Sequence, residues 1–214
     1  PPRTLPAVNT LRTARLRMRP LKSSDFAEWS EVRVRCEPWL SKWEPAPPPK
    51  APDPAVDRQA FAARCRVRDR ERQLGTGFAF GMWHERRFCG EVNISGVVRG
   101  AFNSGHVGYW IDERVAGLGL VGEAVVAVLG YGFDVVRLER MQISVVPRNV
   151  ASRRVIEKLG LRAEGVAVEY LQIDGRREDH IRYAMTVDEW DRRKAELKIV
   201  TAPPRRRAAA AAAR

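Results

Sequence analysis

Alternating hydrophobic and polar positions predict where the strands of this chain lie. Residues 13–21 place apolar side chains between arginines, as a strand with one buried face does. Apolar stretches over residues 78–83 and 88–98 flank the polar segment 85–87, which predicts an antiparallel hairpin. The same reasoning predicts further strands over residues 106–111 and 138–146 and on either side of Asp174-Gly175.

Capping residues and glycines mark where the helices start and stop. Residues 23–24 can cap a first helix that fades near residues 36–38, and Asp53 begins a charged helix that runs to Glu71. The proline-rich residues 45–52 between them form a loop. Three more helices are predicted: residues 119–133, residues 150–159, and a last one begun by the capping box Thr186-Val187-Asp188-Glu189. The chain therefore forms a mixed α/β domain without internal repeats.

The composition indicates one domain with reduced thiols. The chain has 214 residues, of which 44% are hydrophobic, which suits a single sizeable core over residues 11–198 with tails at 1–10 and 199–214. No apolar run approaches the roughly 20 residues that span a bilayer, and no signal-peptide pattern is seen. Three scattered cysteines and three scattered histidines match neither a disulfide framework nor a metal site. We therefore expect a cytoplasmic protein without a bound metal.

The formal net charge of +12 is concentrated near the two ends of the chain. Residues 1–22 and 191–214 each contribute +6, and the stretch between them is neutral. Basic ends can attract an anionic partner such as RNA or a ribosome. They can also be solvated tails, and the Pro- and Arg-rich segment 203–207 with the alanine run behind it favours that interpretation. Any direct contact with nucleic acid is expected from these tails alone.

A glycine-rich turn stands between a predicted strand and a predicted helix. Tyr109-Trp110-Ile111 ends the strand, and residues 116–123 read Ala-Gly-Leu-Gly-Leu-Val-Gly-Glu. Such a turn lets backbone N–H groups converge on a phosphate at the positive end of a helix. The pattern fits neither a Rossmann nor a P-loop motif, and the glycines can also serve only to make the turn tight.

A second block narrows the function. Asn149-Val150-Ala151-Ser152 stands at the start of a predicted helix, and Glu157-Lys158-Leu159-Gly160-Leu161 stands at its end. With this block the chain resembles the GNAT acetyltransferase superfamily, whose acetyl-CoA block has this form. Segments 39–45 and 169–180 resemble its branch of ribosomal-protein-alanine N-acetyltransferases. The likeness spans roughly residues 12–190.

The resemblance implies a GNAT fold, in which a mixed and mostly antiparallel sheet is splayed to hold acetyl-CoA and is flanked by helices. Residues 109–111 would bond the pantetheine arm through their backbones, and one of their N–H groups would stabilise the oxyanion. Asn149 would bond the pantetheine amide, and Ser152 would lie near the leaving sulfur. The pyrophosphate would lie on the backbone amides of the turn: Leu118, Gly119, Leu120, Val121, Gly122 and Glu123.

The turn departs from the family's pattern at two positions. That pattern usually reads Gln/Arg-x-x-Gly-x-Gly/Ala, but Ala116 stands first here and Val121 stands last. Ala116 removes a partner of the phosphate, and Val121 cannot adopt a positive φ cheaply. Arg114 is a candidate to replace the missing charge.

Acetylation of an amine needs a group that takes up a proton. An α-amine has a pKa of about 7.7–8.0 and is mostly protonated at neutral pH, so a general base is expected. The resemblance makes Glu169 the first candidate, although it can also be an ordinary edge-strand carboxylate paired with an arginine. Glu91 is the second candidate, on a strand expected to face the same cleft.

The leaving thiolate needs a hydrogen-bond donor or an acid. Ser152 can supply it, or Ser152 can simply belong to a helix cap with Asn149; Tyr109 and Tyr170 are alternative acids. Trp39 and Trp43 can wall the acceptor groove or pack in the core.

These residues predict an N-acetyltransferase that works by direct transfer in a ternary complex. No cysteine lies in either motif, which disfavours a covalent intermediate. The expected acceptor is the N-terminal α-amine of a protein, with ribosomal proteins among the candidates. A small-molecule amine acetyltransferase and a catalytically weak acyl-CoA-binding regulatory module are the alternatives. Either a monomer or a homodimer fits the sequence.

Overall fold

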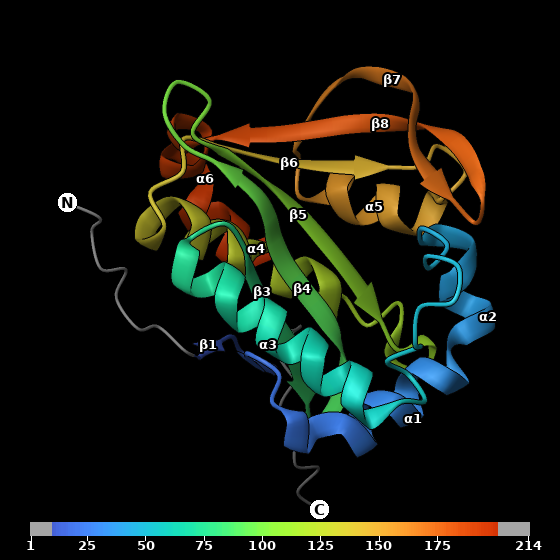
Figure 1. The fold of residues 1–214 in the computed structure, drawn as a ribbon. Helices are drawn as coiled ribbons and strands as arrows, with labels where there is room; N and C mark the ends of the chain where they lie inside the picture. The colour runs from blue at the N-terminus through green and yellow to red at the C-terminus, as the bar shows by residue number, and fades with distance from the viewer. Residues whose placement is uncertain (1–9, 201–214) are drawn as a thin grey trace, which may run out of the picture.

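Helices cover both faces of one open sheet in the computed structural model, which describes residues 10–200 (Figure 1). Neighbouring strands of the described sheet are antiparallel except for β5 and β6, which run parallel. This arrangement confirms the mixed, mostly antiparallel α/β fold that the sequence predicts. In sheet order the strands are β1 (Leu11–Arg12), β2 (Leu16–Arg19), β3 (Phe78–His84), β4 (Arg87–Val98), β5 (Ser104–Ile111), β6 (Arg140–Val145), β8 (Arg176–Thr186) and β7 (Arg162–Ile173).

The helices form two layers around the sheet. On one face α1 contacts β4 and α3 contacts β3; on the other, α4 contacts β2, β4 and β5 and also packs on α5 and α6. A π-helical turn, Tyr131–Val135, follows α4. The helices are α1 (Phe26–Arg35), α2 (Glu37–Leu40), α3 (Arg58–Leu74), α4 (Leu120–Gly130), α5 (Val150–Lys158) and α6 (Val187–Val200).

Local capping explains where two of these helices begin. Thr186 and Glu189 form the predicted capping box, because each backbone N–H bonds the other residue's side chain. The prediction that Asp53 begins the charged helix is wrong. Asp57 caps α3 by accepting from the N–H groups of Gln59 and Ala60, whereas Asp53 only closes the preceding turn.

The basic N-terminal segment belongs to the sheet and not to a tail. Arg12 lies on β1, and Arg17 and Arg19 lie on β2. Most of the positive charge of residues 1–22 therefore lies on or between these strands, and the tail expected over residues 1–10 falls outside the described residues except for residue 10. At the other end α6 runs to Val200, and the rest of the expected C-terminal tail also lies outside them.

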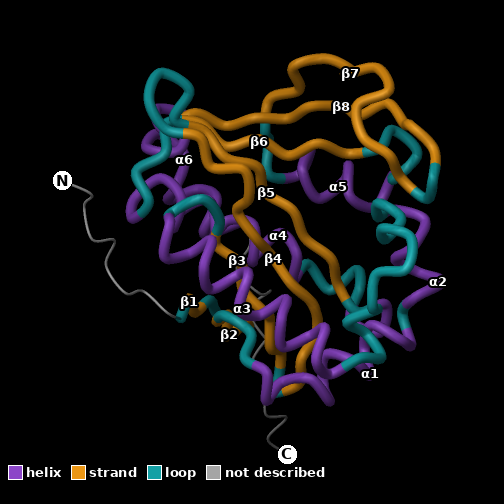
Figure 2. The backbone as a smooth tube through the Cα atoms, viewed as in Figure 1, coloured by secondary structure: helices purple, strands orange, loops and turns teal. Residues whose placement is uncertain are grey.

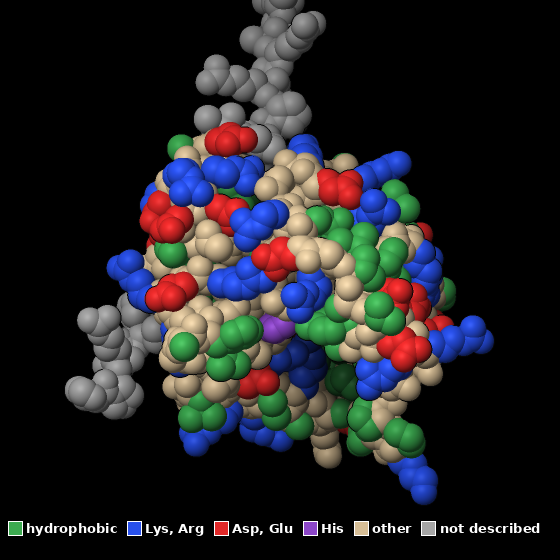
Figure 3. Space-filling model, turned by 90° about the horizontal axis from the view of Figure 1, so that it is seen from above, with side chains coloured by type: hydrophobic (Ala, Val, Ile, Leu, Met, Phe, Trp, Pro, Cys, Tyr) green, Lys and Arg blue, Asp and Glu red, His purple; other side chains and the backbone are tan. Residues whose placement is uncertain are grey.

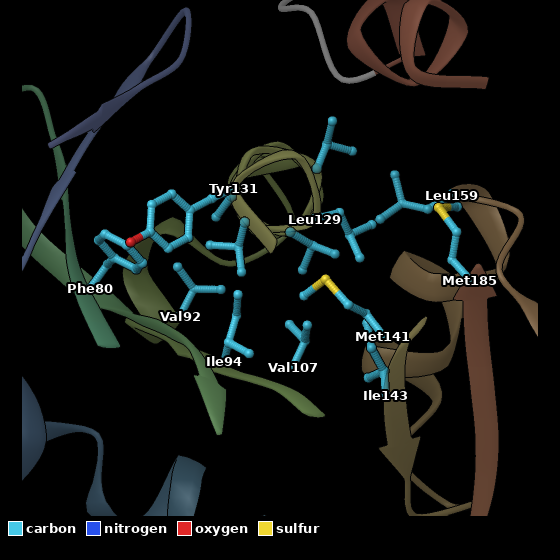
Figure 4. Packing of buried hydrophobic residues seen from close by; sticks show 14 of the residues in the cluster. Phe80, Val92, Ile94, Val107, Leu129, Tyr131, Met141, Ile143, Leu159 and Met185 are labelled. Atoms are coloured by element: carbon cyan, nitrogen blue, oxygen red, sulfur yellow. The ribbon is translucent and has the colours of Figure 1, made fainter. Parts of the chain in front are cut away.

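The main hydrophobic core lies between the sheet and α4, and it joins both halves of the sheet (Figure 4). Phe80, Val92 and Ile94 from β3 and β4 meet Leu129 of α4, and Met141 of β6 contributes on the far side. A second cluster fills the opposite face below α1 and α3. No helix within residues 10–200 is both long enough and apolar enough to cross a membrane.

Candidate active site

The two parallel strands in the middle of the sheet part along their length. Pairing between β5 and β6 ends at His106 with Gln142. Beyond that point β5 stays with β4 as far as Ile111, and β6 stays with β8 as far as Val145. A V-shaped opening therefore forms between the ends of β5 and β6, and the backbone tube shows it clearly (Figure 2).

The V exposes the backbone groups of alternate β5 residues. The N–H of Asp112, which follows β5, donates to the carbonyl of Cys89 on β4 at 2.8 Å. Backbone groups of successive residues point to opposite edges of a strand, so those of Trp110 also turn towards β4, while those of Tyr109 and Ile111 turn into the V. Of the three residues expected to hold a pantetheine arm, Tyr109 and Ile111 turn their backbone N–H and C=O groups into the V, where a ligand can bond them. Those of Trp110 are turned to β4.

The side chain of Tyr109 reaches from β5 to α5. Its hydroxyl lies 2.7 Å from the hydroxyl of Ser152. Burial raises the pKa of Tyr109 to about 12, although the hydrogen bond with Ser152 opposes the shift. The phenol therefore keeps its proton at neutral pH and is available as a hydrogen-bond donor beside the V.

Asn149 holds the start of α5. Its side-chain oxygen accepts the N–H of Ser152 at 3.0 Å, which is the N-cap that the sequence left open as an alternative. The amide nitrogen of Asn149 is not used by that bond. Asn149 can therefore cap the helix and donate to a ligand at the same time.

The glycine turn leaves backbone donors free at the start of α4. Gly117 and Gly119 take the positive φ angles of the turn, 79° and 80°. The N–H of Glu123 makes the first bond within the helix, to the carbonyl of Gly119 at 3.3 Å. The N–H groups of residues 119–122 consequently have no partner within the helix, and free donors at a helix N-terminus are of the kind that can bind an anion.

Three expectations about this turn need correction. Val121 lies inside α4 and needs no positive φ, so its β-branched side chain costs nothing there. Glu123 offers no amide to a phosphate, and its buried carboxylate is held by Arg15. Arg114 is two-thirds exposed and lies 4.0 Å from Glu31 on α1, so the structure does not show it replacing the missing charge.

On the opposite face, a set of contacts that we call the acceptor bridge closes the mouth of the V. Arg148, in the loop before α5, pairs with Glu178 of β8 and lies over the ring of Trp43 at 4.7 Å. The N–H of Asp174, at the β7–β8 turn, donates to the carbonyl of Glu44 at 3.0 Å. The segment that carries Trp43 and Glu44 thus spans from α1 to the β7–β8 hairpin.

One face of the molecule is hollowed. Figure 3 shows hydrophobic and basic side chains around a depression near the centre of the view, with a histidine at its edge. Trp39 is half-buried and packs partly against the second core cluster, while the amine of Lys42 lies 5.5 Å from its ring and 5.6 Å from that of Trp43. These tryptophans border the bridge, and their assignment as walls of an acceptor groove stays a prediction.

Comparison with known proteins shows the family of the chain. Residues 15–162 match the family described as the acetyltransferase (GNAT) domain. The chain belongs to the GNAT acetyltransferase family. A [ribosomal protein uS5]-alanine N-acetyltransferase from Escherichia coli (strain K12) is 30% identical over 182 residues, which are 84% of this chain and 92% of that protein.

Solved structures of GNAT enzymes agree with this assignment. RimJ from Mycobacterium smegmatis, solved in complex with CoA-disulfide, is 30% identical with a TM-score of 0.79 over 86% of this chain and 88% of that one. A ribosomal-protein-S5-alanine acetyltransferase from Vibrio fischeri is 29% identical with a TM-score of 0.76 over 85% and 98%. The resemblance read from the two sequence motifs is confirmed.

Glu91 of this acetyltransferase is not placed to take a proton from an acceptor. Its side chain is 3% exposed, and it accepts bonds from the indoles of Trp29 at 2.7 Å and Trp110 at 3.2 Å. Arg64 adds two further bonds at 2.8 and 3.0 Å. A buried carboxylate that accepts bonds from three side chains joins α1, α3 and the sheet, and burial keeps it away from an acceptor.

Glu169 stands on a distorted stretch of β7. Its φ is 47°, at the point where the pairing with β8 shifts between Ala167 and Leu171. Its backbone is fixed by Asp179 and Arg177, but its carboxylate makes no hydrogen bond or ion pair among the described residues. Such a left-handed, non-glycine residue is uncommon and is found more often at functional sites.

His180, to which no role is assigned from the sequence, closes the family-like segment 169–180 and is buried. Its side chain is 3% exposed, lies against the ring of Tyr170 at 5.6 Å, and has Nδ1 2.9 Å from the carbonyl of Glu178. A carbonyl only accepts, so Nδ1 is the donor in this contact. No group of three His, Cys, Asp or Glu side chains that could hold a metal occurs in the described part of the chain.

Proposed function

We propose that this enzyme transfers the acetyl group of acetyl-CoA to the N-terminal α-amine of a protein, by direct attack in a ternary complex. The observation that carries the proposal is the V between β5 and β6, with its free backbone edge, its phosphate-type turn and the acceptor bridge on the other face. The two relatives named above, which the chain covers over most of their length, are named as acetyltransferases of ribosomal proteins.

The reaction follows from the groups around the V. The amine nitrogen attacks the thioester carbonyl carbon, and a backbone N–H of Tyr109 or Ile111 stabilises the oxyanion. The C–S bond then breaks, and the departing thiolate accepts a hydrogen bond from the Tyr109 hydroxyl. The hydroxyls of Ser152 and Tyr109 lie 2.7 Å apart and either can donate; with Ser152 as the donor, the tyrosine proton is free to point at the sulfur.

The cysteines support direct transfer over a covalent intermediate. Cys36, Cys65 and Cys89 are all buried. Burial raises the pKa of Cys65 to about 11 and that of Cys89 to about 12, and it also raises the pKa of Cys36. Buried thiols that keep their protons are poor nucleophiles.

We propose Glu169 as the general base, and pH dependence tests it. Glu169→Gln should lower kcat/KM at pH 7 by about 100-fold and much less at pH 9, where the α-amine is already deprotonated. The matched variant His180→Gln should show a similar loss at both pH values. If instead the kcat/KM of His180→Gln returns towards the wild-type value at pH 9, and that of Glu169→Gln does not, His180 is the base and Glu169 is not.

An acceptor panel tests the function itself. Release of CoA thiol from acetyl-CoA is measured with lysine-free peptides that begin with alanine or other residues, and with small amines such as polyamines. The same peptides blocked at their α-amine are the control and should release nothing above background. Faster release with small amines would favour the small-molecule enzyme, and no release with any acceptor would favour the regulatory module.

A further inference from the structure

A basic hollow that the acetyl-transfer site does not use lies at the β1–β2 edge of the sheet. Its volume is about 540 Å³. Five arginines and one acid contribute charge to its lining: Arg12, Arg15, Arg17, Arg19, Arg86 and Glu85. We call this feature the arginine hollow. By contrast, the face in Figure 3 interleaves basic and acidic side chains.

Two of the five arginines are already neutralised. Arg15 pairs with Glu123 at 2.9 Å, and Arg19 pairs with Asp25 at 2.7 Å. The side chains of Arg12, Arg17 and Arg86 are exposed, and no ion pair holds them among residues 10–200. The hollow therefore keeps a net positive charge after its internal pairs are formed.

The register of the two strands places like charges side by side. Arg12 of β1 is directly opposite Arg17 of β2. Like charges directly opposite each other in that position destabilise a sheet. Folding alone gives no reason for this arrangement, but an anion held between the two guanidinium groups reverses the sign of the interaction.

The shape and lining of the hollow favour a nucleic-acid backbone. Guanidinium groups match phosphate geometry, and a row of them along two strands offers several contacts to a chain of phosphates. The exposed large hydrophobic residues of the described chain all lie outside the hollow, although a membrane surface would call for some beside the charges. A concave site also suits a strand better than a flat bilayer.

We propose that the arginine hollow binds the phosphate backbone of RNA and so holds the enzyme on the ribosomal particle that carries its acceptor. The second part rests on the proposed function, whereas RNA binding itself does not. The hollow adjoins the cofactor turn, because Arg15 also donates to the carbonyl of Leu118 at 2.8 Å. The phosphates of CoA must therefore be tested as the competing occupant.

Salt-dependent RNA binding tests the proposal. A fluorescent single-stranded RNA oligonucleotide is titrated with the full chain, and Kd is measured by anisotropy between 50 and 300 mM salt. The triple variant Arg12→Gln, Arg17→Gln, Arg86→Gln should raise Kd at 50 mM salt on the order of tenfold and reduce the slope of log Kd against log salt by about 2, because each lost phosphate contact contributes about 0.7. Thermal denaturation checks that the variant is folded.

A matched variant separates a site from general charge. Arg66→Gln, Arg70→Gln, Arg192→Gln removes three exposed arginines from α3 and α6, and it should leave the slope nearly unchanged. Equal losses in both triple variants would overturn the proposal. So would a loss of binding to phosphatidylserine vesicles without a loss on RNA, which would assign the hollow to a membrane.

Activity measurements keep this proposal distinct from the proposed function. Acetylation of a short peptide and the thermal shift by CoA should be the same in wild type and in the arginine-hollow variant. A smaller rise in Tm on addition of CoA in that variant would show that the cofactor occupies the hollow, and it would overturn the proposal of RNA binding. Failure of wild type to acetylate any peptide would remove the proposed function while leaving the RNA result standing.

Discussion

At the scale of single residues, a hydrogen bond between two side chains links the two halves of the splayed sheet. Tyr109 and Ser152 are 43 positions apart in the chain, yet their hydroxyls lie 2.7 Å apart across the V. Both groups can donate and accept, so the pair can orient a single free proton. The raised pKa of Tyr109 keeps that proton on the phenol throughout the neutral range.

Removing this donor should slow the chemical step without weakening the binding of the donor substrate. We expect Tyr109→Phe to lower kcat about 100-fold, because one preorganised donor to a developing charge is lost, with little change in KM for acetyl-CoA. Ser152→Ala should cost less, since the tyrosine proton stays. Steady-state kinetics on an alanine peptide measure both variants, and wild-type kcat in Tyr109→Phe would exclude the tyrosine from the reaction.

Asn149 serves two purposes at the element scale, and two substitutions can separate them. Asn149→Asp keeps the cap oxygen of α5 but loses the amide donor, so the free energy of unfolding should stay near that of wild type while the thermal shift by acetyl-CoA falls. Asn149→Ala should lose both, with a cost of about 1 kcal/mol in stability. If Asn149→Asp binds acetyl-CoA like wild type, Asn149 is a cap and nothing more.

Local signals made some elements predictable, and tertiary contacts decided the rest. The capping box at Thr186 and the cap at Asn149 could be predicted because their partners lie three residues away. Asp53 and Asp57 look alike as caps in the sequence, and only the observed turn shows that Asp57 starts α3. The hydrogen bonds that the Glu91 carboxylate accepts come from residues 19 to 62 positions distant, which no local pattern contains.

A carboxylate between two arginines ties β7 to β6. The hydrogen bond from Arg140, helped by one from Arg162, holds the pKa of Glu164 at about 2 against the effect of burial. A group whose pKa is lowered on folding stabilises the fold above its unfolded pKa of about 4.3, and this contribution is lost as the pH falls towards the folded value.

The stability difference made by Glu164 should therefore depend on pH. We expect Glu164→Gln to lower Tm at pH 7 by about 2–4 °C, the shift that about 1 kcal/mol gives in a chain of this size, and the gap should narrow between pH 5 and pH 3. Glu196→Gln, at an exposed carboxylate 3.7 Å from Arg193, is the control and should change Tm little at any pH. A gap that is constant across the pH range would show that the arginines do not stabilise the charged form.

At the scale of the whole molecule, contacts on both sides of the V add to the β5–β6 pairing and the Tyr109–Ser152 bond in holding the two halves of the sheet together. The core around α4 joins them below the V, and the acceptor bridge joins them at its mouth. The arginine hollow lies at the far edge of the sheet, on β1 and β2. The acceptor bridge lies apart from the hollow, whereas the hollow adjoins the cofactor turn through Arg15, so a change in the bridge should leave cofactor and RNA binding intact.

The acceptor bridge gives the sharpest test of that separation, because Arg148 is the neighbour of Asn149 in the chain but contacts only the acceptor side. Arg148→Gln removes the pair with Glu178 and the bond to the carbonyl of Lys42, and so loosens the segment that carries Trp43. We expect KM for a peptide to rise about fivefold, equivalent to the roughly 1 kcal/mol of an exposed ion pair, with KM for acetyl-CoA unchanged. Arg153→Gln breaks the comparable pair with Glu157 on α5 and is the control, which should leave the peptide KM as it is. A rise in KM for acetyl-CoA with Arg148→Gln would mean that the bridge shapes the cofactor side and that the acceptor enters elsewhere.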